Sequence, residues 1–598
     1  MLSVALATVI LVASRTQSDA VAQFVAQSET QLPANARPLM VPQAGRNLGF
    51  GGSPAYATLT FRTDPVYGEV GVMAVPGPSK QPYNVLAHGG SNTLAIAKGD
   101  TVAYAVAMRA TNALEGKTLV SAFIERKVPT WSSVGQWSGS PDQGWRRVWL
   151  IGEAKEDFAP GTVNVSVHLG AVKQTVELGP MAAWNLGRVT ESSVLPYNPS
   201  TYPGRAANAP WRTEANRRIE RIRKGDLTVR VQTADGKVVP NALVHVKLTR
   251  NAFEFGSFCE YPAVDLGPDG ERYRTWFKRL FNKGTAPMYW ADWGWPSERE
   301  RYLGICEFLQ RSGIPIKGHP MIYPGGQFLP TSLKALAKDP PAMRAEMYRH
   351  MAEKVADVKR FNFVSWDVLN ELRDLHDLPA VFGSDQIYAD IFQETKRLDP
   401  KPTRYLNENT ILTNGGNTES QQSEYERQLR DLIQRGAPLQ GIGLQGHFGD
   451  AMTAPERMWE ILDRFHRFKL PIQITEFDLP IRDAAAQADF TRDFLTAMYA
   501  HEAVTGVTIW GFWEGQMWQP AGALIDRKWN LRPNGRAWLD LVERKWATDA
   551  RLTTARDGKT KVRGYTGRYT VTVTNGRRTG RGEVKLGREG KTLVVTVR

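Results

Sequence analysis

The chain has 598 residues, of which 42% are hydrophobic and 23% charged. This composition is typical of folded proteins and excludes wholesale disorder. Two cysteines, Cys259 and Cys306, exclude a disulfide-rich scaffold and a zinc site built from several cysteines. The sequence leaves open whether the two are bridged. At roughly 100–200 residues per domain, the length predicts about three or four domains.

The formal net charge of +14 is concentrated near the C-terminus. Residues 547–598 hold 13 Lys and Arg against 4 Asp and Glu, and these alternate with Thr, Val and Tyr. We interpret this segment as a basic all-β region whose charge lies on a solvated face. Attraction to an acidic polymer, such as a uronic-acid-bearing glycan, is the alternative. Because no groove-reading motif is found, we expect no nucleic-acid partner.

An apolar run, Leu2–Ala13, lies at the N-terminus. It is too short to span a bilayer and suits the apolar part of a secretory signal, with small residues following at Ser18–Ala22. The usual Lys or Arg before such a run is missing, which leaves the true start site open. We expect a leader within residues 1–30, a secreted, periplasmic or extracellular protein, no membrane span and a monomer.

Residues 31–190 are predicted to form a β-sandwich domain. Short alternating runs such as Thr101–Met108 and Val163–His168 are separated by Gly, Pro, Asn and Asp, which is typical of a sandwich or jelly roll. The segments Lys98-Gly99-Asp100, Gly144–Trp149 and Gln174–Gly179 resemble jelly-roll carbohydrate-binding modules.

Three tryptophans of this domain are candidate sugar platforms, because Trp offers a flat apolar face to the C–H face of a sugar ring. The alternative is that they are core or sandwich-edge aromatics. They are Trp131, Trp137 and Trp145.

Residues 191–225 are interpreted as a linker, and residues 226–546 as a (β/α)₈ barrel that begins with a β-hairpin. Short apolar runs such as Phe363–Val368 and Ile472–Thr475 alternate with amphipathic stretches such as Pro341–Lys359. Strand–helix alternation over nearly 300 residues is typical of this barrel. The C-terminal segment is then a separate all-β unit.

Active groups of such barrels lie at the C-terminal ends of strands. Two carboxylates directly follow buried runs there, Glu371 and Glu476. Hydrolysis of a glycosidic bond needs such a pair, one to protonate the leaving oxygen and one to attack the anomeric carbon or activate water. We find no Ser nucleophile elbow, no Cys–His pair and no zinc-ligand spacing. We therefore expect no metal and no cofactor.

Five segments together resemble glycoside hydrolase family 10, the endo-β-1,4-xylanase family. Trp366–Glu371 is similar to its acid/base motif and Ile474–Asp478 to its nucleophile motif. The other three are Lys317-Gly318-His319, Gly441–His447 and Thr508–Gly511. The resemblance implies retaining hydrolysis, with Glu371 as acid/base and Glu476 as nucleophile.

The resemblance further implies a set of substrate-binding or supporting residues around the two glutamates. These are His319, Asn370, Gln445, His447, Trp510, Asn282, Trp366 and Asp478.

Two segments depart from the family pattern. An Asn-Glu and a Lys-Trp are expected where Phe281–Trp293 stands, and a Trp-His where Ile322-Tyr323-Pro324 stands. Both segments shape the sugar subsites, so the choice of substrate is open. Aromatic residues there and after the last strand are candidate subsite residues: Tyr289, Trp290, Trp293, Tyr323 and Trp513.

The sequence thus predicts a secreted endo-β-1,4-glycosidase whose partner is xylan. The same chemistry on another β-linked polysaccharide, and an inactive barrel that only binds glycan, are the alternatives.

Overall fold

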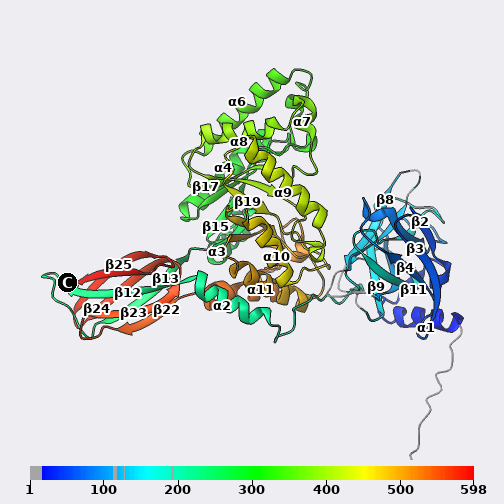
Figure 1. The fold of residues 1–598 in the computed structure, drawn as a ribbon, viewed down its shortest axis with the longest axis horizontal. Coiled ribbons are helices and arrows are strands. Elements are labelled where there is room, and N and C mark those ends of the chain that lie inside the picture. The colour runs from blue at the N-terminus through cyan, green and yellow to red at the C-terminus, as the bar shows by residue number, and fades with distance from the viewer. Residues whose placement is uncertain (1–16, 112–117, 127, 129, 142, 190–193) are drawn as a thin grey trace, which may run out of the picture. The chain divides into compact units, whose positions relative to one another are not determined.

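The computed structural model describes residues 17–598, apart from 112–117, 127, 129, 142 and 190–193. It divides into two compact units, Met1–Ser200 and Thr201–Arg598, which are considered separately (Figure 1). The apolar run of the expected leader, Leu2–Ala13, lies outside the described residues.

The first unit is a two-sheet β-sandwich, as the alternating pattern predicts. One sheet has the order β3 (Thr58–Asp64), β4 (Gly68–Val75), β11 (Gln174–Asn185), β6 (Thr101–Ala110) and β9 (Arg146–Glu153), with β1 (Arg37–Pro38) paired to β11. The other has the order β2 (Gly49–Gly52), β5 (Val85–Gly89), β10 (Asn164–His168), β7 (Val120–Arg126) and β8 (Ser132–Gly139). Helix α1 (Gln17–Glu29) buries Phe24 beside Trp149 and Trp184.

The second unit contains a closed barrel of eight parallel strands, which confirms the predicted (β/α)₈ fold. The strands are β14 (Glu254–Phe258), β15 (Lys283–Pro287), β16 (Ile316–His319), β17 (Phe363–Asn370), β18 (Thr403–Glu408), β19 (Gly441–Leu444), β20 (Ile472–Phe477) and β21 (Val504–Ile509). The surrounding helices are α3 (Pro268–Leu280), α4 (Trp295–Arg311), α5 (Thr331–Lys334), α6 (Pro340–Val358), α7 (Asp377–Phe382), α8 (Gln386–Leu398), α9 (Glu419–Gln434), α10 (Pro455–His466), α11 (Ala484–Tyr499) and α12 (Pro533–Leu539). Parallel strands buried on both faces account for the continuous apolar runs in the sequence.

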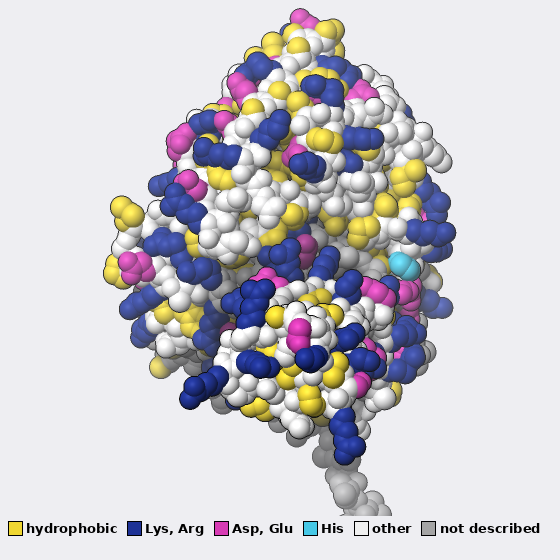
Figure 2. Space-filling view, turned by 90° about the vertical axis from the view of Figure 1, so that its left-hand side faces the viewer, with side chains coloured by type: hydrophobic (Ala, Val, Ile, Leu, Met, Phe, Trp, Pro, Cys, Tyr) yellow, Lys and Arg dark blue, Asp and Glu magenta, His cyan; other side chains and the backbone are white. Residues whose placement is uncertain are grey.

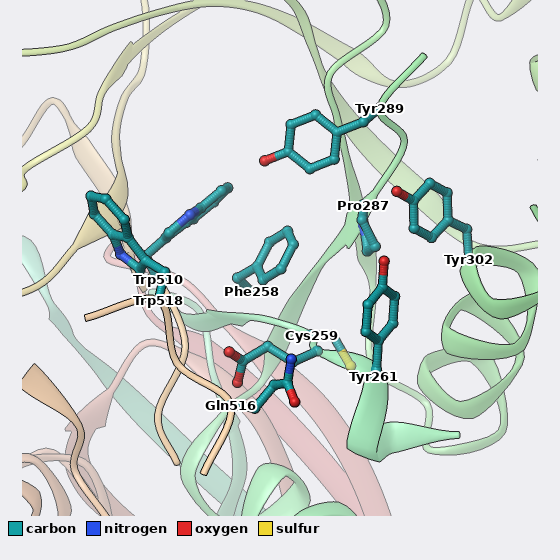
Figure 3. Close-up of a pocket in the computed structure, with 10 residues that line it drawn as sticks. Phe258, Cys259, Tyr261, Pro287, Tyr289, Tyr302, Trp510, Gln516 and Trp518 are labelled. Carbon is teal, nitrogen blue, oxygen red and sulfur yellow. The ribbon is translucent and has the colours of Figure 1, made fainter. Parts of the chain in front are cut away.

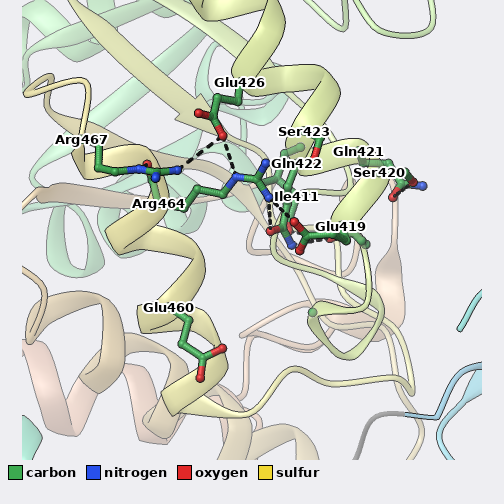
Figure 4. Close-up of polar contacts among 12 residues, drawn as sticks. Ile411, Glu419, Ser420, Gln421, Gln422, Ser423, Glu426, Glu460, Arg464 and Arg467 are labelled. Carbon is green, nitrogen blue, oxygen red and sulfur yellow. Dashed lines mark hydrogen bonds and ion pairs between the residues drawn. The ribbon is translucent and has the colours of Figure 1, made fainter. Parts of the chain in front are cut away.

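Charged side chains join neighbouring helices on the outside of the barrel. Arg464 of α10 lies 2.6 Å from Glu419 and 2.8 Å from Glu426, both on α9, and Arg467 lies 3.5 Å from Glu426 (Figure 4). Each exposed ion pair contributes little to stability. An arginine that binds two carboxylates forms two such pairs, while the conformational entropy of only one arginine side chain is lost.

The hairpin expected to open the barrel belongs to a second β-sandwich instead. Strands β12 (Lys224–Thr233) and β13 (Leu243–Asn251) pair with strands beyond the barrel, so one sheet runs β23-β12-β26 and the other β22-β13-β24-β25. The C-terminal strands are β22 (Asp549–Thr553), β23 (Lys559–Tyr565), β24 (Gly567–Asn575), β25 (Arg578–Leu586) and β26 (Lys591–Val597). The predicted domain boundary between residues 546 and 547 is therefore wrong, because strands before the barrel and strands after it form one sandwich. A two-stranded hairpin buries too little apolar surface to be stable by itself, and both groups of strands need the shared core.

The expected linker, residues 191–225, also requires correction. Helix α2 (Trp211–Ile222) packs on the barrel through Trp211, Ala215 and Ile219, all of which are buried in its core. The many charged residues of this helix are the reason that the segment was interpreted as a linker. Its few apolar side chains recur about every four residues, and this spacing is enough to bury one side of a helix.

The basic C-terminal segment carries its charge on solvated faces, as expected. All 13 Lys and Arg of residues 547–598 are exposed. Figure 2, which looks onto the side of the molecule with the C-terminal strands, shows Lys and Arg side chains spread over it with acidic side chains between them.

Candidate active site

The two predicted carboxylates meet at one mouth of the barrel, joined by a network of amide side chains. The Glu371 Oε1 atom accepts a hydrogen bond of 2.7 Å from Gln445, and the Glu476 Oε1 atom accepts one of 2.7 Å from Asn407. Asn370 links the two halves, since its Oδ1 accepts from Asn407 at 2.8 Å and from Gln445 at 3.4 Å. The network fixes both carboxylates through four different strand ends.

The strand ends explain how these side chains are aimed. Glu371 directly follows β17 and has a φ of 56°, a left-handed conformation that is uncommon for a residue other than glycine. This conformation turns the chain sharply off the strand, while its N–H still donates to the Asn407 carbonyl at 2.9 Å. Glu476 lies within β20 and is only 4% exposed.

Asn407 was not among the predicted site residues, although it contacts the centre of the network. Besides Glu476 and Asn370, it accepts a 2.6 Å hydrogen bond from the Thr475 hydroxyl. The signal was present, because Asn407-Glu408 directly follows an apolar strand as Asn370-Glu371 does. Only the register of neighbouring strands reveals that this amide faces the nucleophile candidate.

His447 lies between two carboxylates. Its Nε2 is 3.2 Å from Oε2 of Glu476, and its Nδ1 is 2.8 Å from Oδ2 of Asp478. Burial alone lowers the pKa of His447, but the hydrogen bonds to Asp478 and Glu476 outweigh it and raise the pKa to about 10. The ring is therefore an imidazolium at neutral pH, a cation held between two acidic side chains.

His319 is held by a buried ion pair beneath the cleft. Its Nδ1 lies 2.9 Å from Asp367, whose other oxygen lies 2.7 Å from the Lys317 ammonium. Burial raises the pKa of Asp367, but Lys317 and His319 more than reverse this and hold it below its usual range. The contact fixes the orientation of the imidazole and leaves its Nε2 for a sugar hydroxyl.

Aromatic residues lie near the carboxylates. Tyr323 donates a 2.6 Å hydrogen bond to Oε2 of Glu371 and stacks on Phe328 at 3.6 Å. Tyr289 packs edge-on against His319 at 5.5 Å, and Trp510 packs edge-on against the same imidazole at 4.9 Å. Rings around a polar centre suit the apolar and polar faces of a sugar.

Trp293 and Trp518 extend this aromatic surface. Trp293 packs against Tyr289 at 5.2 Å and is 52% exposed. Trp518, which the sequence interpretation missed, donates a 2.8 Å hydrogen bond to Asp478 and packs against His447 at 4.9 Å. It lies in a loop, and the sequence around it has no strand or helix pattern from which the position of its side chain could be predicted.

Three predicted site residues lie elsewhere. Asn282 precedes β15 at the N-terminal end of the barrel, where it bonds the backbone of Asn251 and Phe253. Trp366 is fully buried and donates to Asp399 at 3.0 Å. Trp290 stacks on His350 of α6 at 4.0 Å and is 6% exposed. Trp366 points to the other face of β17 than its neighbours, and Asn282 and Trp290 lie outside the strands, so the printed contacts of these three residues are with the barrel framework.

Trp513 stacks on Trp529 at 4.6 Å, between two loops that follow β21. No printed contact joins it to either catalytic candidate, so its role as a subsite residue stays a prediction.

A pocket of about 170 Å³ lies at the ends of β14, β15 and β21 (Figure 3). Its lining includes Glu260 and the rings of Tyr289, Trp510 and Trp518, which pack against His319 or His447. Figure 3 shows the rings of Tyr289 and Trp510 on either side of the space above Phe258.

Within residues 17–598, apart from the gaps given above, no group of three His, Cys, Asp or Glu side chains could hold a metal ion. The same described residues include no helix of the length and apolarity that a bilayer crossing requires. Cys259 and Cys306 are both free and buried, which answers the question that the sequence left open.

A closed (β/α)₈ barrel with two carboxylates at the C-terminal ends of β17 and β20 has the arrangement that glycoside hydrolysis requires. Residues 300–539 match the model of glycosyl hydrolase family 10. The matched segment lies within the barrel and runs from α4 to α12.

Curated relatives and a solved structure are similar to parts of this chain. The anti-sigma-I factor RsgI6 of Acetivibrio thermocellus is 28% identical over 403 residues, which cover 65% of this chain and 49% of that protein. Endo-1,4-beta-xylanase 2 of Arabidopsis thaliana is 27% identical over 365 residues, 59% of this chain and 32% of that protein. The chain thus spans between a third and a half of the length of these relatives. Native xylanase10C from Cellvibrio japonicus aligns with a TM-score of 0.43 and 16% identity, covering 82% of this chain and 96% of that one.

Proposed function

We propose that the barrel is a retaining endo-β-1,4-glycosidase that cleaves xylan, and that the protein acts outside the cytoplasm. The observation that carries the proposal is the pair Glu371 and Glu476, held by one hydrogen-bond network at one barrel mouth. Another β-linked polysaccharide is the second candidate substrate, because Tyr289 and Tyr323 stand where the family pattern differs.

Glu371 acts as the acid and then as the base. It protonates the glycosidic oxygen as the bond to the leaving sugar breaks, and it later takes a proton from the water that replaces that sugar. The hydrogen bonds from Tyr323 and Gln445, one to each oxygen, keep the carboxyl group in one orientation for both steps. A carboxyl group that is already in position does not have to meet the substrate by diffusion, so the entropy cost of bringing the two together is avoided.

Glu476 acts as the nucleophile and forms a covalent glycosyl-enzyme. The imidazolium of His447 and the amide of Asn407 each contact one oxygen of this carboxylate and hold it in one orientation. Asn370 lies between the two glutamates, where its amide reaches the hydroxyl next to the reacting carbon. A hydrogen bond that strengthens as positive charge develops on the sugar lowers the barrier.

The test is hydrolysis of xylan, mixed-linkage β-glucan and mannan, followed by the release of reducing ends. We expect release from xylan, loss of at least 10³-fold with Glu476→Gln, and near-normal activity with Glu353→Gln, a control on the outside of the barrel. Proton NMR of the first product should show the β-anomer. Initial release of the α-anomer would exclude the double-displacement reaction, and release from β-glucan or mannan alone would replace xylan as the substrate.

We further propose that the N-terminal sandwich binds the same polysaccharide on its β2-β5-β10-β7-β8 sheet. Trp131 is 63% exposed and donates to Glu125 at 2.7 Å on this sheet. Phe123 and His168 lie on the face opposite the core, with ring centroids 4.6 Å apart. Aromatic rings on one sheet, of which Trp131 is exposed and the other two are half-buried, offer a stacking surface for successive sugars.

The two other candidate platforms of the sandwich are structural. Trp137 is 9% exposed and belongs to the hydrophobic core. Trp145 lies on the other sheet, where it packs against Tyr67 at 5.0 Å and under the Arg109 guanidinium.

Deletion of residues 1–200 tests the role of the sandwich, because these residues form a separate compact unit. We expect weaker binding to insoluble xylan and unchanged hydrolysis of short soluble oligosaccharides. Trp131→Ala in the full chain should reproduce the binding loss, with Trp145→Ala as the control. Equal binding by the full and shortened chains would overturn this part of the proposal.

A further inference from the structure

Glu408 is a buried carboxyl group beside the candidate active site and has no role in the mechanism above. It is the last residue of β18, directly after Asn407, and its side chain is completely buried. Burial raises the pKa of Glu408 to about 7, against smaller opposing effects of the Arg373 charge and of two backbone N–H groups. A carboxyl group is costly to bury, so its hydrogen-bond partners indicate which part of the fold it stabilises.

The carboxyl group of Glu408 joins the loops that follow two neighbouring strands. Its Oε2 atom accepts a 3.1 Å hydrogen bond from the backbone N–H of Arg373, in the loop after β17. Its Oε1 atom accepts a 2.9 Å hydrogen bond from the backbone N–H of Asn409, in the loop after β18. An ionised carboxyl group accepts through both oxygens, whereas an amide side chain accepts through only one. The residue type at this position therefore matches the two N–H groups that it faces.

The loop after β17 begins with the acid/base candidate. Glu371 has the left-handed φ of 56°, and its N–H donates to the carbonyl oxygen of Asn407 at 2.9 Å. The N–H of Asp374 donates back to the carbonyl oxygen of Glu371 at 3.3 Å, which closes a turn over residues 371–374. Strand β18 thus holds this turn at two points, the first residue through the Asn407 backbone and the third, Arg373, through the Glu408 side chain. An uncommon backbone conformation persists where its surroundings fix it in this way.

Polar side chains of the same two loops add further contacts. The Arg373 guanidinium donates to Oδ2 of Asp374 at 2.9 Å and to Oδ1 of Asn409. The Asn409 amide donates to the same oxygen of Asp374 at 3.0 Å. Asp374 is exposed and the other two side chains are half-buried, and exposed charge pairs contribute little to stability. The buried carboxyl group of Glu408 is therefore the main fixed point between the loops.

We propose that Glu408 is a positioning residue for acid catalysis, which fixes the turn at residues 371–374 and thereby aims the Glu371 carboxyl group at the glycosidic oxygen. The proposal rests on the glycosidase function proposed above, in which Glu371 is the acid. Proton transfer requires about 3 Å between the acid and the leaving oxygen, so a small shift of the turn weakens acid catalysis. Two successive residues of β18 then support the two carboxylates, since Asn407 binds Glu476 and Glu408 binds the turn that carries Glu371.

The test uses the dependence of the rate on the leaving group. Phenolate needs a proton donor to depart from phenyl β-xylobioside, whereas dinitrophenolate departs from dinitrophenyl β-xylobioside without one. Glu408→Gln keeps the size of the side chain but only one acceptor. We expect kcat/KM to fall about tenfold on the phenyl substrate and less than twofold on the dinitrophenyl substrate. Glu394→Gln, at a buried position of α8, is the matched control and should stay within about twofold on both. If β-glucan or mannan proves to be the substrate, the aryl cellobiosides or mannobiosides replace the xylobiosides.

The ratio of the two kcat/KM values separates positioning from a structural role, because it does not depend on how much of a variant is folded. Glu408→Asp, which keeps the charge but shortens the side chain, should change the ratio in the same direction and replaces Glu408→Gln if that variant does not fold. Glu371→Ala should change the ratio more than either. An unchanged ratio in Glu371→Ala would overturn the acid role of Glu371 and this proposal with it. A ratio that changes in Glu371→Ala but in neither Glu408 variant would overturn the positioning role alone.

Discussion

The imidazole of His447 lies 3.2 Å from Glu476 and 2.8 Å from Asp478, so one ring faces two carboxylates. Replacing it by Asn removes a cation and keeps a polar side chain. Because one oxygen of Glu476 then loses the contact that fixes it, we expect kcat/KM to fall at least tenfold. The measurement is the initial rate on a soluble substrate at pH 6. An unchanged kcat/KM would contradict the assigned role.

The same ring makes stability depend on pH. The pKa of His447 is raised to about 10 in the folded chain, against ~6.5 in an unfolded one. Its contribution to stability is therefore fully present below about pH 6.5 and is lost as the pH rises through 10. His447→Asn should destabilise the barrel by about 2 kcal/mol at pH 6 and much less at pH 10. Urea unfolding at both pH values measures this, and an equal loss at both would refute it.

Tyr323 donates its hydroxyl to Glu371 and is one of two side chains that hold this carboxyl group in place. Tyr323→Phe removes that donor without changing the ring. We expect kcat/KM to fall about fivefold, which corresponds to the loss of a hydrogen bond worth about 1 kcal/mol. Tyr348→Phe, on the outer helix α6, is the matched control and should stay within about twofold of the unmodified chain. Equal rates for the two variants would contradict the positioning role of Tyr323.

Arg223 lies in the segment that leads into the C-terminal sandwich, and its side chain binds this segment to the barrel. Its guanidinium donates 2.7 Å hydrogen bonds to the carbonyl oxygens of Tyr499, His501 and Val504. Arg223→Met leaves these three carbonyls without the donor and should destabilise the second unit by about 3 kcal/mol. Arg221→Met, at an exposed position on the same helix, should cost less than about 0.5 kcal/mol. Similar chemical unfolding midpoints for the two variants would show that the contact is unimportant.

Removal of residues 549–598 should disrupt the whole C-terminal sandwich, including the two strands that precede the barrel. Strands β12 and β13 would lose their partners and expose the apolar side chains of Leu227, Val229 and Val246, which are now buried. We expect aggregation and binding of a hydrophobic dye, which size-exclusion chromatography and fluorescence detect. Removal of residues 1–200, a separate compact unit, should leave the remainder monodisperse. A monodisperse C-terminal deletion with an unchanged Tm would contradict the shared core.

The sequence by itself determined the barrel, the β-sandwich before it and the two catalytic candidates. Buried parallel strands produce apolar runs, and a carboxylate directly after such a run must lie at the barrel mouth, because all eight C-terminal strand ends meet there. Glu408 follows a strand in the same way, and the family resemblance of the surrounding motifs singled out Glu371 and Glu476.

Only the tertiary structure decided which neighbours join them. Asn407, Trp518 and Glu260 reach the site from other strand ends and a loop, whereas Asn282 and Trp366 face away from it. Strands β12 and β13 lie some 300 residues before the strands that complete their sandwich. Strand register, side-chain direction and long-range pairing depend on contacts between distant parts of the chain, which no local spacing records.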